Sequence, residues 1–124
     1  MQRFKQKNGH VEKIKTTVSF PLKLDMLPYT YQARSQDTRE NFALARSCTY
    51  DLQSVVVHDG SLDTGKLTSP FSSHLADVLG HYKSYSRVGN QWFVFNDHKV
   101  NLASKSDVLK SEAYLLFYVI QSLA

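Results

Sequence analysis

The sequence contains a histidine, His81, and an asparagine, Asn96, whose spacing suits a general base and the residue that orients it. They lie in two β-prone runs, 81–88 and 91–97, joined by the turn-forming pair Gly89-Asn90. A two-residue turn at that point makes the two side chains diagonal neighbours on one face of a hairpin. Diagonal α carbons are roughly 7–8 Å apart, so an amide can reach an imidazole. The hairpin therefore predicts two members of a Cys-His-Asn catalytic site.

Length and composition fit one modest domain or a piece of a larger one, since the chain has 124 residues of which 42% are hydrophobic. No apolar run approaches the roughly 18–20 residues that span a bilayer. The N-terminus is charged and has no apolar signal core, so we predict an intracellular protein without membrane attachment. The single cysteine, Cys48, excludes an internal disulfide framework.

Positive charge gathers in the first third of the chain, where residues 1–46 hold nine Lys or Arg and four Asp or Glu. The whole chain has a formal net charge of +4, so the remainder is close to neutral. A basic region of this kind could attract nucleic acid or an acidic partner. Because its lysines alternate with apolar residues and no base-reading motif is present, we interpret them as solvated strand faces and do not expect nucleic-acid binding.

The other elements predict an α+β chain that is mainly antiparallel β-sheet with one or two short helices. Residues 10–24 alternate as a strand does, and Pro21 weakens its continuation. One face of this run would hold Ile14, Thr16, Val18 and Phe20, opposite a face of lysines and hydroxyl residues. The remaining expected elements are a surface connection over 28–47 with a helical turn near 40–45, a strand over 49–58, a loop over 59–80 with a short helix at 72–79, a helix capped by Ser104 and ending near 112, and a central strand over 113–120.

Four blocks of sequence, in the right order, point to a family. They are Tyr50-Asp-Leu with Val57-His58, then Gly80-His81-Tyr82, then Trp92-Phe-Val-Phe-Asn-Asp97, then Ala113-Tyr-Leu-Leu-Phe-Tyr118. Together with Arg3-Phe4 and Phe20-Pro21, they resemble the C-terminal part of the ubiquitin-specific proteases. The likeness is greatest to the branch that works in the SAGA coactivator complex on ubiquitinated histone. It implies a papain-like cysteine peptidase fold, of which this chain would form the palm and part of the fingers.

The resemblance implies roles for five residues. His81 is similar to the general base that takes a proton from a cysteine thiol. Asn96 is similar to the residue that orients this base, in agreement with the hairpin register. Asp97 is the adjacent, weaker candidate, and the register alone puts it on the opposite face. Gly80 and Tyr82 are similar to residues that line the narrow channel for the Gly-Gly tail of ubiquitin.

The implied reaction is hydrolysis of the isopeptide bond at the C-terminal glycine of ubiquitin, by a thiol mechanism that needs no cofactor. The implied partners are ubiquitin, a ubiquitinated protein such as histone, and subunits of a SAGA-type complex. The implied location is the nucleus, with the cytoplasm as the alternative. Trp92 and Phe95 are expected in the core beneath the site.

One departure from the family is the absence of its Cys box, which supplies the nucleophile, and of its paired zinc-binding cysteines. The family's nucleophile opens a helix, whose dipole and amides lower the thiol pKa, whereas Cys48 precedes a strand. The histidines show no metal-ligand spacing with one another or with Cys48, so we expect no metal site. We therefore expect residues 1–124 to be the C-terminal part of a catalytic domain, with its base and orienting residue but without its nucleophile. Such a chain is expected to be inactive alone.

A second departure is an apparent insertion of fifteen residues, 66–80, where the family runs almost directly into His81-Tyr82. In the family this loop closes over the ubiquitin tail. We hypothesise a retained short intron or a gene-model artefact, because Gly65-Lys66 is compatible with a splice donor and fifteen codons keep the frame. Sequencing of the spliced message tests this hypothesis, which is wrong if every transcript contains these codons.

Two other functional classes stay open at the level of sequence. One is a non-catalytic ubiquitin-binding or adaptor module that keeps the palm surface. The other is a non-functional product that cannot fold alone, because the strand over 113–120 would expose apolar surface without its covering half.

Overall fold

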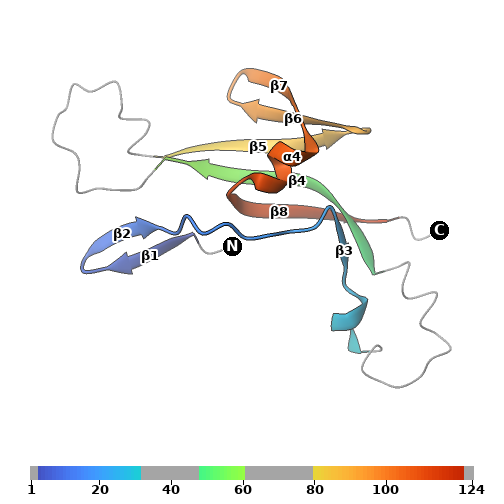
Figure 1. The fold of residues 1–124 in the computed structure, drawn as a ribbon, viewed down its shortest axis with the longest axis horizontal. Coiled ribbons are helices and arrows are strands. Elements are labelled where there is room, and N and C mark those ends of the chain that lie inside the picture. Colours follow the sequence, from blue (N-terminus) through green and yellow to red (C-terminus); the bar gives the residue numbers. More distant parts are fainter. Residues whose placement is uncertain (1–2, 32–47, 61–79, 122–124) are drawn as a thin grey trace.

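The computed structural model describes residues 3–31, 48–60 and 80–121 and is mostly antiparallel β-sheet (Figure 1). A two-stranded sheet pairs β1 (Phe4–Lys7) with β2 (His10–Lys13). A six-stranded sheet contains β3 (Lys23–Asp25), β4 (Thr49–Asp59), β5 (His81–Val88), β6 (Gln91–Asn96), β7 (Lys99–Ala103) and β8 (Ala113–Ile120). The helical elements that lie wholly within these described residues are the 3-10 turn η1 (Leu27–Tyr29) and the helix α4 (Lys105–Lys110). The expected fold class of antiparallel β-sheet with short helices is confirmed.

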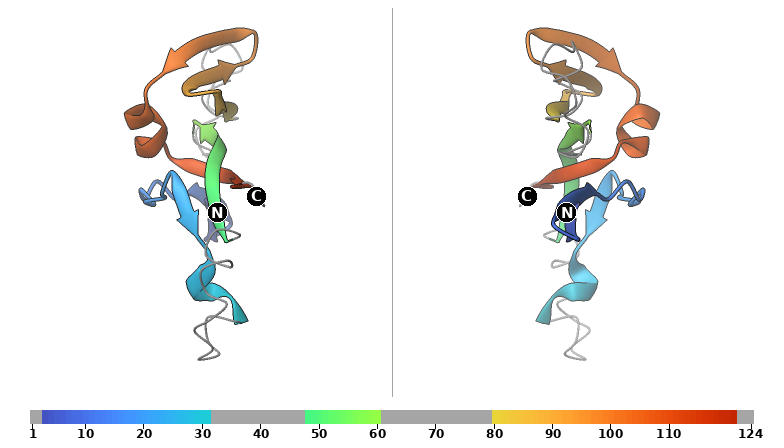
Figure 2. Two further views of the ribbon diagram at one scale, coloured as in Figure 1. Left: turned by 90° about the vertical axis from the view of Figure 1, so that its right-hand side faces the viewer. Right: turned by 90° about the vertical axis from the view of Figure 1, so that its left-hand side faces the viewer.

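The larger sheet is built around β4, the strand predicted over 49–58. One end of β4 pairs with β3, the other end pairs with β5, and β8 pairs along most of its length. Strands β5, β6 and β7 continue from it as a meander. Val55 and Val57 of β4 form one buried cluster with Val108 of α4 and Phe20 of the N-terminal segment. Figure 2 shows α4 standing off one side of the sheet, where it covers this core.

The β5–β6 hairpin is confirmed with its predicted register. Val88 pairs with Gln91, and every further pair of the ladder follows from that one. Gly89 takes a φ of +58°, as a tight hairpin turn requires. Strand β6 ends at Asn96 rather than Asp97, because Asp97 has a φ of +51° and turns the chain toward β7.

The single strand expected over 10–24 is wrong. Strand β2 ends at Lys13, and no strand occupies residues 14–22 before β3 begins. The residues expected on one face of that strand differ in burial, since Phe20 is 6% exposed and belongs to the core, whereas Val18 is 41% exposed. The alternation of residue types that predicted a strand therefore continues through residues 14–22, although these residues form no strand.

Arg3 explains why the strand ends at Lys13. Its side chain is buried, with the residue 2% exposed, and it donates hydrogen bonds to backbone carbonyls of the segment that follows. Its Nη1 donates to the carbonyls of Ile14 and Thr16, and its Nε donates to the carbonyl of Ala113 at 2.8 Å. Carbonyls that bond to a guanidinium need no neighbouring strand. The Asn8-Gly9 pair, with φ values of +51° and +77°, folds β2 back onto β1 instead.

Strand β8 matches the predicted strand over 113–120 but not its expected central position. Within the described part of the chain it pairs with β4 alone. Every second side chain is open to solvent, since Leu115, Phe117 and Val119 are 43%, 51% and 53% exposed. A contiguous apolar surface of this kind usually contacts another part of a protein.

Several expectations fall on residues outside the described ranges. These are the helical turn near 40–45, the helix at 72–79 and residues 66–79 of the apparent insertion. The described start of the connection over 28–47 forms η1. Among the described residues, no helix is long and apolar enough to cross a membrane.

Helix α4 begins with the predicted capping box. The hydroxyl of Ser104 accepts a hydrogen bond from the backbone N–H of Asp107 at 3.1 Å, and the Asp107 carboxylate accepts one from the backbone N–H of Ser104 at 2.9 Å. Hydrogen bonds from the side chain and backbone of Ser104 lower the pKa of Asp107. The helix ends at Lys110 rather than near 112, because Ser111 has an extended backbone.

Replacement of Ser104 by alanine is expected to lower the free energy of unfolding by about 1 kcal/mol, because it removes half of the capping box. The folded pKa of Asp107 is depressed, so its contribution is present above the ordinary carboxyl pKa and is lost as pH falls through the folded value. The difference between wild type and Ser104→Ala in urea unfolding should therefore shrink below about pH 4. A difference that stays constant with pH contradicts the proposed coupling.

Candidate active site

His81 and Asn96 meet at the open end of the β5–β6 hairpin. His81 begins β5 and Asn96 ends β6, and Oδ1 of Asn96 lies 2.5 Å from Nε2 of His81. An acceptor at this distance assigns the proton of the neutral ring to Nε2, which leaves the lone pair on Nδ1. The His81 side chain is 36% exposed, so the ring is open to solvent. The geometry allows Nδ1 to act as a base while the asparagine holds the ring.

Asp97 approaches the same ring nitrogen, although the hairpin register put it on the opposite face. Its Oδ2 lies 3.7 Å from Nε2 of His81, and its side chain is 72% exposed. The positive φ of Asp97 takes it out of the alternation of the strand and explains the difference. At this distance the carboxylate supplies charge but no hydrogen bond, so Asn96 is the better-placed orienting group.

A second histidine, His58, shapes the turn that leads into His81. Gly80 has a φ of +77°, and a β-carbon on it would lie 2.1 Å from Nε2 of His58. His58 is 3% exposed and pairs with Tyr82 across β4 and β5. Both the backbone and the neighbouring ring therefore exclude a side chain at position 80. The resemblance pointed to Gly80 as a residue that lines the channel for the ubiquitin tail, and the structure adds an internal reason for glycine at this position.

His58 also lies within a cluster of four rings, the aromatic cluster Phe4, His58, Tyr82 and Tyr114. The ring of His58 is edge-on to Phe4 at 5.1 Å and to Tyr82 at 4.8 Å. Tyr114 lies 6.1 Å from Phe4 and 5.9 Å from Tyr82. Because Tyr82 is 53% exposed, the cluster reaches the surface directly beside His81. Sequence reasoning singled out Tyr82 alone, since the other three rings come from strands far apart in the chain.

Charged groups fix the strands around His58. The Lys13 side chain is only 5% exposed, donates to the carbonyl of His58 and pairs with Glu112 at 3.4 Å. Burial lowers the pKa of His58, and the charge of Lys13 lowers it further, so this ring is neutral near pH 7. On the neighbouring strand, Lys83 binds Asp59 at 2.7 Å, and that hydrogen bond raises the pKa of Lys83. These contacts hold the ends of β4 and β5 together beside the candidate site.

Cys48 lies far from His81. It immediately precedes β4, whereas His81 pairs with Asp59 at the other end of that strand. At about 3.3 Å per residue, the two ends are roughly 35 Å apart, so Cys48 cannot attack a substrate held at His81. Trp92 is 3% exposed and belongs to the core, and Phe95 is half-buried. The described residues include no group of three side chains placed to bind a metal ion.

Comparison with known proteins assigns the chain to a family. The family model of the ubiquitin carboxyl-terminal hydrolases matches residues 1–118. The chain belongs to this family. Ubiquitin carboxyl-terminal hydrolase 27 of Mus musculus is 39% identical to it over 124 residues, which cover 94% of this chain and 25% of the relative. Ubiquitin carboxyl-terminal hydrolase 3 of Homo sapiens is 38% identical over 108 residues, which cover 86% of this chain and 17% of the relative.

Solved structures of the family share this fold. The SAGA Ubp8/Sgf11/Sus1/Sgf73 DUB module bound to ubiquitin aldehyde matches with a TM-score of 0.70 and 31% identity, over 98% of this chain and 23% of that one. The module with Ubp8(C146A) bound to monoubiquitin matches with a TM-score of 0.63 and 29% identity, over 98% of this chain and 22% of that one. The chain thus spans only 17% to 25% of the length of these ubiquitin carboxyl-terminal hydrolases.

Proposed function

We propose that this chain supplies the base and the orienting residue of a cysteine-type deubiquitinase. The hydrogen bond between Nε2 of His81 and Oδ1 of Asn96 is the observation that carries the proposal. Nδ1 of His81 takes the proton of a cysteine thiol, and the thiolate attacks the carbonyl carbon of the last glycine of ubiquitin. The imidazolium then protonates the leaving lysine amine, and water hydrolyses the acyl-enzyme with His81 again as base.

The proposed domain assignment makes residues 1–124 the C-terminal part of a ubiquitin-specific protease catalytic domain, with 66–80 as an insertion. The thiol nucleophile then comes from outside these residues. The distance of Cys48 from His81 supports this, as does the match to only 17–25% of the length of the two relatives compared above. The exposed apolar face of β8 also supports it, because Phe117 and its neighbours offer a surface for the rest of such a domain.

Gly80 and Tyr82 are proposed to line the path of the Gly-Gly tail of ubiquitin. The missing side chain at position 80 and the solvent-facing ring of Tyr82 support this, because both residues adjoin His81. Phe4 and Tyr114 extend the aromatic surface away from the ring of Tyr82. A tail without side chains can lie flat against such a surface, which keeps water away from the scissile bond.

Ubiquitin is the proposed substrate, and the solved relatives that hold ubiquitin aldehyde and monoubiquitin support this choice. Ubiquitinated histone, subunits of a SAGA-type complex and a nuclear location are proposed from the likeness to the Ubp8 modules. Those modules contain Sgf11, Sus1 and Sgf73 beside Ubp8. Proteins similar to Sgf11, Sus1 and Sgf73 are therefore the first candidate partners to test for binding to this chain.

A chimaera tests the proposed function. Residues 1–124 replace the matching quarter of mouse ubiquitin carboxyl-terminal hydrolase 27, and hydrolysis of a ubiquitin C-terminal fluorogenic amide is measured. Activity that depends on His81 supports the proposal. A chimaera that folds but stays inactive, both with residues 66–80 and without them, contradicts it. Deletion of 66–80 places Gly65 directly before His81 and therefore tests the insertion separately.

The chain alone is the companion sample, and it is expected to be inactive. Hydrolysis by the chain alone that is abolished by Cys48→Ser overturns the assignment of the nucleophile to another segment. Specific binding of ubiquitin in an NMR titration, together with an inactive chimaera, favours the alternative of a non-catalytic ubiquitin-binding module.

In the active chimaera, Asn96→Ala is expected to lower kcat on the order of 10²-fold or more, and Asp97→Ala by less than about tenfold. The reason is distance, since Nε2 of His81 lies 2.5 Å from the amide oxygen and 3.7 Å from the carboxylate. Steady-state kinetics on the fluorogenic amide measure both values. Asn96→Asp keeps an acceptor and should restore most of the rate, whereas the reverse order of effects assigns the orienting role to Asp97.

A further inference from the structure

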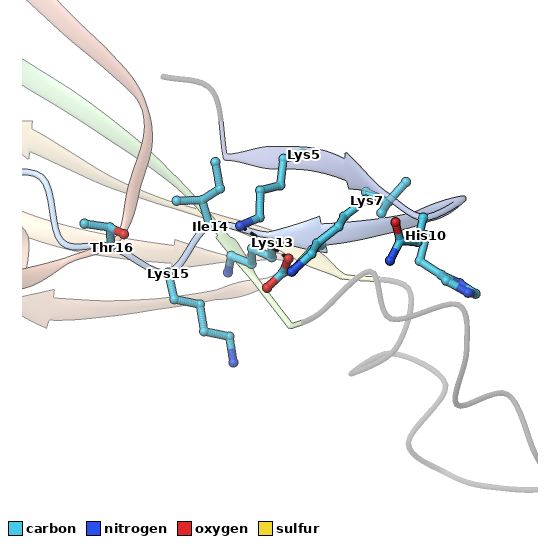
Figure 3. Close-up of a pocket in the computed structure, with 10 residues that line it drawn as sticks. Lys5, Lys7, His10, Lys13, Ile14, Lys15 and Thr16 are labelled. Atoms are coloured by element: carbon cyan, nitrogen blue, oxygen red, sulfur yellow. Dashed lines mark ion pairs between the residues drawn. The ribbon is translucent and has the colours of Figure 1, made fainter.

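A basic hollow on the β1–β2 hairpin includes neither His81 nor Asn96 in its lining. Its lining includes four lysines and a histidine, namely Lys5, Lys7, Lys13, Lys15 and His10. Figure 3 shows Lys5, Lys7 and Lys13 close together over the hairpin, with Lys15 extending from the segment that follows β2. Four of the nine lysines and arginines of residues 1–46 therefore lie on this hairpin or on the segment that follows it.

The lysines of this hairpin hollow differ in whether their charge is already compensated. Lys5 pairs with Glu12 at 3.4 Å, and Lys13 pairs with Glu112 at 3.4 Å. Lys7 and Lys15 have no ion-pair partner within the described ranges. Both are exposed, so their ammonium groups are open to a partner in solution.

We propose that the hairpin hollow binds an acidic peptide segment of a partner protein. Two uncompensated ammonium groups, on Lys7 and Lys15, match two carboxylates of a short segment. The hairpin also offers backbone groups, because its two strands pair with no third strand in the part of the chain that the structure describes. An extended peptide can add to such an open edge while its acidic side chains reach the lysines.

A nucleic acid is less suited to the same surface. A phosphate backbone is held by a row of cations that continues over several elements, and its affinity increases with their number. Here two free lysines lie on one hairpin and the segment that follows it, and the carboxylate of Glu12 also lines the hollow. The local arrangement therefore favours a short acidic peptide.

The hollow adjoins the candidate active site without including it. Lys13 lines the hollow and also donates to the carbonyl of His58, whose ring lies beside Gly80. A bound acidic segment is therefore held close to the candidate site. Binding there requires no hydrolysis and is measured without it, so this inference stands or falls independently of the proposed function.

Fluorescence anisotropy with the full chain tests the inference, using a short labelled peptide of alternating Glu and Ser as the probe. The double variant Lys7→Glu/Lys15→Glu is expected to weaken binding by about tenfold or more. The matched control is Lys99→Glu/Lys105→Glu, which changes net charge equally at exposed positions of β7 and α4. This control should weaken binding by less than about twofold, because its charges act on the peptide only at long range, where salt screens the attraction.

Three results overturn the inference. The first is equal weakening by the two double variants, which reduces the binding to general attraction between opposite charges. The second is tighter binding of an oligonucleotide of equal charge, lost in the hairpin variant, which makes the hollow a nucleic-acid interface. The third is no loss in Lys7→Ala/Lys15→Ala, which removes charge without reversing it. Circular dichroism of each variant checks that the fold is retained.

Discussion

Replacement of His81 by alanine is expected to lower kcat/KM of the chimaera by at least about 10⁴-fold. Nδ1 of His81 is the group that we propose takes the thiol proton, and its neighbours cannot replace it. The amide of Asn96 does not accept a proton, and Asp97 lies at the opposite ring nitrogen, Nε2. Affinity for ubiquitin should stay near that of the unchanged chimaera, because the role proposed for His81 is in proton transfer rather than in holding the tail. Steady-state hydrolysis and a separate binding titration measure the two effects.

His98→Ala is the matched control for this prediction. His98 is exposed in the turn between β6 and β7, close in sequence to Asn96, and its loss should change the rate by less than about twofold. Alkylation of the nucleophilic thiol as a function of pH adds a second readout. A thiol without its imidazolium partner should react only near the pKa of a free cysteine. Turnover and a reactive thiolate that persist in His81→Ala would exclude His81 as the base.

The hairpin of the candidate site could be predicted because its determinants are local. A two-residue turn at Gly89 fixes the register of both strands, and the register makes His81 and Asn96 neighbours. The same is true of α4, whose capping box lies within four consecutive residues starting at Ser104. Each of these features needs only contacts between residues close in the chain, so the pattern of residue types is sufficient.

Features that depend on distant contacts were missed. A buried guanidinium at Arg3 takes the carbonyls of residues after β2, and no alternation of residue types reveals an acceptor taken in this way. The ring of His58 comes to Gly80 from another strand, so no local pattern of residue types indicated this contact. Asp97 was misplaced because one residue with a positive φ ends the strand alternation on which the prediction relied. Features set by residues close in the chain could thus be predicted from the sequence, whereas features set by contacts between distant residues could not.

Replacement of Gly80 by alanine is expected to lower the free energy of unfolding by about 3 kcal/mol or more, against about 1–2 kcal/mol for Gly9→Ala. Both glycines have a φ of +77°, so alanine meets the same backbone penalty at either position. At Gly9 nothing lies within 4 Å of the new β-carbon, whereas at Gly80 it would lie 2.1 Å from Nε2 of His58. Urea unfolding of the two variants in the chimaera measures the difference. Equal losses would mean that the ring moves aside without cost.

A double-mutant cycle with His58→Ala isolates the contact between residue 80 and the ring. Without the ring, a β-carbon at position 80 has room, so Gly80→Ala should cost roughly 1–2 kcal/mol less in that background. The remaining cost is then the left-handed backbone, which the cycle leaves unchanged. The ring also supports Tyr82 at 4.8 Å, on the other side of His81 in sequence, so a displaced ring moves both neighbours of the base. Gly80→Ala should for that reason lower kcat even at temperatures where the variant is fully folded. A cost that is the same with and without His58 would assign the requirement for glycine to the backbone alone.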